Sequence, residues 1–176
     1  TSVSGDARAF GVRIFGNLLA TLTNSGTINA TATAAAAEVS GADVGGIYVD
    51  GALRGTLTNS GAINAVARAS TGEYSGAEAS GVHVDDVLSG TLANSGMITS
   101  AATSSAFAYA AAASVKGDLS GTLTNSGAID ATARTADAKY SSYALAAGVS
   151  VDGDYGETAT MSGTLINTGT INAAAT

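Results

Sequence analysis

His83 and Asp85 are the pair of side chains in this sequence best suited to acid–base chemistry. His83 is the only histidine of the chain, and Asp85 follows it by two residues. A catalytic pair of this kind would also need a nucleophile and a group that stabilises an oxyanion. The Gly-x-Ser-x-Gly elbow, the phosphate-binding loop, the His-Glu-x-x-His motif and the dinucleotide fingerprint are all missing from the sequence. We therefore expect His83 to face outward, exposed and without a chemical role, and we expect no enzyme.

Aspartates gather at one recurring bend of the chain, and calcium is the ion that they suggest. Calcium takes several oxygen ligands, so stacked carboxylates could bind it. However, the Gly-Gly-x-Gly-x-Asp nonapeptide of calcium-binding β-rolls is missing, and the aspartates do not keep a constant register. The pattern favours a solvated turn and no cofactor, with calcium as the alternative. The residues in question are Asp50, Asp85, Asp86, Asp118, Asp152 and Asp154.

Two columns of outward side chains could contact a ligand. One consists of threonines, with Thr23, Thr58 and Thr124 beside it, and its Thr-x-Thr surface resembles that of ice-binding solenoids, although Ala93 and Ile166 interrupt it. Threonine is also simply a common exposed residue of strands. The main threonine column comprises Thr21, Thr56, Thr91, Thr122 and Thr164.

The second column is aromatic and comprises Tyr74, Tyr109 and Tyr140. Its rings could bind glycans or a partner protein. Packing at a corner is favoured, because Val39 takes the same position in the first copy.

An internal repeat positions all of these residues. The segment from Thr56 to Ile63 occurs in five copies, and the spacings between successive anchor asparagines are 35, 35, 31 and 42 residues. These anchors are Asn24, Asn59, Asn94, Asn125 and Asn167. We expect repeats at 4–39, 40–74, 75–109, 110–140 and 141–176 that together form one domain.

Within a copy, apolar and polar residues alternate with a period of two, which is typical of strands. Three short runs, separated by Gly/Ser/Asp bends, predict three strands in each copy. We expect an all-β fold, a right-handed parallel β-solenoid of about five coils with one coil per repeat of ~35 residues. An alternative is two smaller coils per repeat, of about fifteen and twenty residues.

Stacked coils bring equivalent residues into columns. Each buried leucine or isoleucine would contribute roughly 1.5–3 kcal/mol, and alanine columns between them predict a thin interior. Stacked asparagines can hydrogen-bond to one another and to the turn backbone along the coil axis, which favours a structural role, with ligand contact as the alternative. The apolar columns are Leu22, Leu57, Leu92, Leu123 and Leu165, and Ile28, Ile63, Ile98, Ile129 and Ile171.

Length differences between copies predict loops. The distance of fifteen residues from an anchor asparagine to Val39, Tyr74, Tyr109 or Tyr140 is constant. Fourteen residues separate Val151 from Leu165, against eight in the other copies, so we expect a loop at 152–157. The short fourth copy should lose its residues between Tyr109 and Val115.

Composition limits the class of partner. The 176 residues include 45% hydrophobic and 12% charged residues, with a net charge of −7 and no cysteine or proline. This hydrophobic content is too high for disorder, and the missing basic patch argues against nucleic acid. The longest weakly apolar stretch, 106–115, is mostly alanine and too short to span a bilayer, so we expect no membrane insertion of this segment.

The motif Gly-Thr-Leu-Thr-Asn-Ser-Gly-Ala-Ile-x-Ala at 55–65 and 121–131 resembles the repeats of autotransporter passenger domains and related bacterial surface adhesins. The resemblance covers nearly the whole chain and implies secretion, a position outside the outer membrane and a rod-like shape. We expect a structural or adhesive rod or filament, with ice binding as the alternative. Expected partners are copies of itself stacked head to tail or edge to edge, flanking solenoid of the same chain, or a host or neighbouring cell surface.

Overall fold

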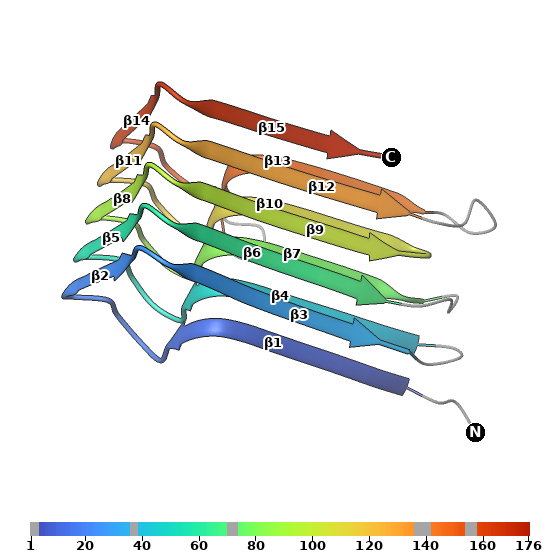
Figure 1. The fold of residues 1–176 in the computed structure, drawn as a ribbon. Helices are drawn as coiled ribbons and strands as arrows, with labels where there is room; N and C mark the ends of the chain where they lie inside the picture. The colour runs from blue at the N-terminus through green and yellow to red at the C-terminus, as the bar shows by residue number, and fades with distance from the viewer. Residues whose placement is uncertain (1–3, 36–38, 70–73, 136–141, 154–157) are drawn as a thin grey trace.

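The chain forms an all-β parallel solenoid in a computed structural model that describes residues 4–35, 39–69, 74–135, 142–153 and 158–176 (Figure 1). Three parallel sheets, each with five strands in the described residues, enclose the interior. Sheet 1 contains β1 (Ser4–Ile14), β4 (Val39–Val49), β7 (Gly76–Val84), β10 (Phe107–Val115) and β13 (Tyr143–Val151). Sheet 2 contains β2 (Thr21–Asn24), β5 (Thr56–Asn59), β8 (Thr91–Asn94), β11 (Thr122–Asn125) and β14 (Thr164–Asn167). Sheet 3 contains β3 (Thr27–Ala34), β6 (Ala62–Ala69), β9 (Met97–Ser104), β12 (Ala128–Thr135) and β15 (Thr170–Ala175).

One repeat makes one turn of the solenoid. Each strand pairs with its equivalent in the next copy, as Asn24 of β2 does with Asn59 of β5. This pairing rules out two smaller coils per repeat. From β1 the chain returns to sheet 1 four times, ending at β13, so it completes about four full turns and not five. The difference arises because a turn is complete only when the chain has come back to the same sheet.

The interior consists of the predicted columns. Leu57 and Ile63 are fully buried, and their neighbours along both columns pair in register with them. A further column, which starts at Leu18 and Leu53, continues to Met161 through isolated bridges at the corner before sheet 2. Leu165 of β14 is 38% exposed, because among the described strands only β11 pairs with β14. Burial is therefore greatest in the middle coils.

Sheet 1 bends where glycine meets the isoleucine column. Ala42 and Val44 are buried before the bend, and Ile47 and Val49 after it, so the inward positions shift by one residue. A Cβ atom on Gly46 would lie 2.3 Å from Cγ2 of Ile63, which leaves no room for a side chain. β1 turns sharply near its end in Figure 1. The same row contains Gly11, Gly81, Ala112 and Gly148.

Length differences fall at the corners between sheets. Thr103 of β9 precedes Phe107 of β10 by four residues, whereas the equivalent Arg68 precedes Gly76 by eight. The short fourth copy therefore loses its four residues at the corner from sheet 3 to sheet 1. The prediction that they are lost between Tyr109 and Val115 was wrong, because β7 and β10 pair residue for residue up to Val115. The longer corner after β13 includes residues 154–157, which lie outside the described part.

The described residues contain no helix, and therefore no helix that could cross a membrane.

Candidate binding surface

The five anchor asparagines form a hydrogen-bonded ladder at the bend between sheets 2 and 3. Nδ2 of Asn59 donates to Oδ1 of Asn94 at 2.8 Å, and Nδ2 of Asn94 donates to Oδ1 of Asn125 at 2.7 Å. The same nitrogens also donate to backbone carbonyls, as Asn94 does to Ala128 at 3.2 Å. Asn24 and Asn167 end the ladder with bonds of 2.7 and 2.8 Å to their neighbours. Since Asn59, Asn94 and Asn125 are buried, these bonds satisfy polar groups that water does not reach.

The threonine column lies in register on the outer side of sheet 2. Thr21, Thr56, Thr91, Thr122 and Thr164 pair in sequence along β2, β5, β8, β11 and β14. The second threonine column is in register as well, but Ala93 and Ile166 take two of its positions. The resulting surface is narrow, because each strand of sheet 2 has only four residues.

The tyrosines do not form the predicted column. Tyr109 lies within β10 and pairs with Glu78 and Leu145. Tyr74 precedes β7 and is 69% exposed, and Tyr140 lies outside the described residues. The prediction placed Tyr109 by its sequence distance from the anchor asparagine. That position is wrong because the corner before β10 is four residues shorter than the corner before β7.

His83 is buried, contrary to the sequence-based expectation. It lies on the face of β7 opposite Val82 and Val84, yet it is only 2% exposed. The ring of Tyr48, its neighbour in β4, stacks on it with centroids 4.4 Å apart. Nε2 of His83 lies 3.3 Å from Oδ1 of Asp85, and Nδ1 has no hydrogen-bond partner among the described residues. The histidine is thus covered by the adjacent coil, which alternation along a single strand does not show.

The aspartates at the bend have separate partners. Asp50 accepts a hydrogen bond from Nε of Arg13 at 3.1 Å, and Asp118 accepts one from the backbone of Thr160 at 2.7 Å. Asp152 accepts a bond from Ser150. Within the ranges that the structure describes, no three histidine or acidic side chains lie close enough together to hold a metal ion. Asp154 lies outside those ranges.

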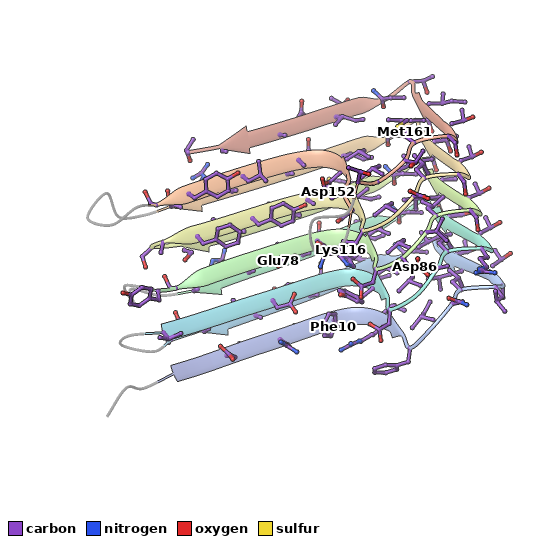
Figure 2. All side chains as sticks on the ribbon, turned by 180° about the vertical axis from the view of Figure 1, so that it is seen from behind. Phe10, Glu78, Asp86, Lys116, Asp152 and Met161 are labelled. Carbon is purple, nitrogen blue, oxygen red and sulfur yellow. The ribbon has the colours of Figure 1, made fainter. Side chains whose placement is uncertain are left out.

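The outer side of sheet 1, here called the lateral face, carries charged, aromatic and small polar side chains. Figure 2 looks onto it and labels Phe10 on β1, Glu78 on β7 and Lys116 after β10. Equivalent positions in successive copies differ in type here, whereas the Asn, Leu and Ile columns repeat. In strand order three of its rows are Asp6, Gly41, Gly76, Phe107 and Tyr143; Arg8, Asp43, Glu78, Tyr109 and Leu145; and Arg13, Tyr48, His83, Ser114 and Ser150.

Aromatic rings and an ion pair lie in contact on the lateral face. Phe10 contacts Tyr48 edge to face, with ring centroids 5.1 Å apart, and Tyr48 continues the stack to His83. The guanidinium of Arg13 lies 4.6 Å from the ring centroid of Phe10 and forms an ion pair with Asp50 at 3.0 Å. Cation–π and ion-pair contacts together restrain Arg13. Aromatic and arginine side chains of this kind are enriched in protein interfaces.

Burial shifts the pKa of four groups on this face. Burial and the nearby carboxylates, Asp85 first among them, raise the pKa of Tyr48 to about 12. Burial also raises the pKa of Tyr109 and Glu78. It lowers the pKa of His83 below its ordinary 6.5, although the hydrogen bond with Asp85 acts in the opposite sense. His83 is therefore neutral near pH 7, and the charge of the face comes from its carboxylates, arginines and lysine.

The sequence-based prediction missed the lateral face because it considered only columns in which most copies have the same residue. The signal was available in the same comparison: positions at which aligned copies differ are not fixed by stacking, and there the copies place Arg, Asp, Glu, Tyr and Phe. Such a surface presents groups that can contact a ligand.

The chain matches no protein-family model, no curated protein sequence and no solved structure.

Proposed function

We propose that this chain is part of a non-catalytic structural and adhesive rod on the exterior of a bacterial cell. The observation that carries the proposal is the contrast between repeated inner columns and a varied lateral face. Stacked Asn59 and Asn94 join one coil to the next, while the outer residues of sheet 1 change from coil to coil. This contrast is what a rigid support for a binding surface requires. The resemblance of the repeat to autotransporter passenger domains supports the extracellular position.

The proposed rod lengthens by about 4.8 Å with each coil. We expect it to wind right-handed, because crossovers between parallel strands almost always do. Further coils, from the same chain or from a second copy, would continue the hydrogen bonding at the outer edges of β1–β3 and β13–β15. Electron microscopy of the native material tests this part: straight rods or filaments support it, and compact particles contradict it.

Attachment of beads that carry the chain to cell surfaces tests the adhesive part. Phe107 on the lateral face and Met97 on sheet 3 are 42% and 40% exposed, so they form a matched pair. Phe107→Ser should reduce attachment several-fold, and Met97→Ser should leave it unchanged. Equal attachment by both variants and the parent chain would remove the lateral face from the proposal.

Ice binding is the second candidate, and the register of the threonine column on sheet 2 is the observation that favours it. Hydroxyls would repeat at about 4.8 Å along the rod. Thermal hysteresis of the chain, and its loss in Thr91→Tyr, would support this candidate. Its absence from the parent chain would rule it out.

A further inference from the structure

We infer that a hollow at the start of the lateral face binds an alkylammonium group, such as the side chain of a lysine or a free amine. The hollow has a volume of about 240 Å³ and lies across β1, β4 and β7, with Phe107 of β10 at one side. That volume is below the range of pockets for whole cofactors, about 300–1,000 Å³, and suits a single side-chain-sized group. An alkylammonium group is then the class of ligand that the proposed adhesive surface would bind. Only the biological role of this binding rests on the proposed function.

Two glycines create the hollow. Gly41 and Gly76 pair with each other in the first row of the face, where Asp6 and Phe107 carry side chains on either side. A Cβ atom on Gly41 would lie 2.7 Å from Oδ1 of Asp6, so the Asp6 carboxylate leans over Gly41. A Cβ atom on Gly76 would lie 3.8 Å from Cδ1 of Phe107, so the ring edge lies beside Gly76. A carboxylate and an aromatic ring thus border the same hollow from opposite sides, on strands that are three spacings apart.

This arrangement fits a cation. An ammonium nitrogen about 2.8 Å from an oxygen of the Asp6 carboxylate would form an ion pair at one side of the hollow. The ligand's alkyl chain would reach the Phe107 ring at the other side and gain an apolar contact there. The alkyl chain behind the nitrogen would lie over Gly41 and Gly76, where no side chain interferes.

Charge in the second row favours the same ligand. Asp43 and Glu78 lie beside the hollow, and Arg8 is the cation that lines it. Together with Asp6, the hollow has three carboxylates and one guanidinium, so its net charge is −2. Arg8 neutralises Asp43 only weakly, since Nε and Oδ2 are 3.7 Å apart and the Arg8 side chain is largely exposed.

Glu78 and Asp6 have neither an ion pair nor a hydrogen bond among the described residues. Burial raises the pKa of Glu78 more than the charge of Lys116 lowers it, and Lys116 itself contacts Asp85 at 3.9 Å. A bound ammonium ion would supply the missing countercharge.

Titration of the ¹⁵N-labelled chain with n-butylammonium, followed by NMR, tests the inference. We expect shifts centred on the amides of Gly41, Gly76 and Phe107. Asp6→Asn should weaken the binding by about fivefold or more, and Phe107→Ser by about two- to fivefold because it removes the apolar contact. Asp86→Asn is the matched control, because it makes the same change of charge at an exposed residue after β7. It should leave the affinity unchanged.

Three results would overturn the inference: no shifts on the lateral face, equal shifts with neutral n-butanol, or equal weakening by Asp6→Asn and Asp86→Asn. Thermal unfolding of each variant shows whether a loss of binding reflects a loss of fold, and Phe107→Ser gives a second test if Asp6→Asn does not fold. Trilysine that binds more tightly than n-butylammonium indicates a lysine of another protein, and equal affinity indicates a free amine. Because no cell attachment is measured, failure here leaves the rod proposal and its bead assay intact.

Discussion

Replacement of Asn94 by alanine should strongly destabilise the solenoid, and the same change at Asn167 should not. Asn94 accepts a hydrogen bond from Asn59 at 2.8 Å and donates one to Asn125 at 2.7 Å. Both neighbours are buried, so the alanine variant would leave Oδ1 of Asn125 and one N–H of Asn59 without this partner and away from water.

Each buried polar group left unsatisfied costs about 1–3 kcal/mol, so we expect a loss of about 3 kcal/mol from the free energy of unfolding for Asn94→Ala. For a chain of this length that corresponds to a decrease in melting temperature of about 6–12 °C. Asn167 is exposed, and water can take over its bonds to Asn125 and Gly169. We therefore expect less than about 1 kcal/mol for Asn167→Ala.

Guanidinium-induced unfolding followed by circular dichroism measures both losses. The two variants remove the same atoms from the same column and differ in burial, so helix or strand propensity does not separate them. Equal losses for Asn94→Ala and Asn167→Ala, or a loss below about 1 kcal/mol for Asn94→Ala, would refute the reasoning that the ladder stabilises the fold through buried hydrogen bonds.

Three further predictions concern close packing and protonation. Gly61→Ala should lower the free energy of unfolding by more than about 3 kcal/mol or prevent folding, because its Cβ would lie 1.9 Å from the carbonyl oxygen of Gly26. Gly26→Ala has nothing within 4 Å of its Cβ, so it should be nearly neutral in chemical denaturation. Burial lowers the pKa of His83, so the unfolded chain takes up a proton near pH 6.5 before the folded chain does; this contribution to stability is present above that pH and is lost as the pH falls below it. His83→Phe should therefore reduce the loss in unfolding free energy between about pH 7.5 and 5.5, and an unchanged loss would contradict the assignment. Because the pKa of Tyr48 is raised to about 12, its contribution to stability should disappear as the pH rises from 10 through 12, and Tyr48→Phe should remove a phenolate step near pH 12 in an absorbance titration.

The columns could be predicted from the sequence because they depend on two local rules. Alternation along a strand assigned Leu57 and Ile63 to the interior, and recurrence of Asn59 at the same place in each copy placed the asparagines in one ladder. Neither rule needs knowledge of the other sheets. The result was the correct fold class and the correct choice of one coil per repeat.

Errors arose where a contact depends on two coils or on a corner. Burial of His83 comes from the ring of Tyr48 in the preceding coil, and a pattern within one strand contains no such information. The register of Tyr109 depends on the corner before β10, where four residues are missing. The hollow beside Phe107 depends on glycines in two other strands, so it becomes visible only when the copies are aligned side by side.

Equal register along the whole ladder also bears on how such a chain can change in length over evolution. A recombination event that joins Thr56 of one gene copy to Thr91 of another would delete a complete coil, and Leu92 would take the place of Leu57 between Leu22 and Leu123 without a break in the column. The reverse exchange would duplicate a coil. Because the lateral face differs between coils, each event would also shuffle its aromatic and charged residues, so length and surface would diversify together while the interior stayed the same.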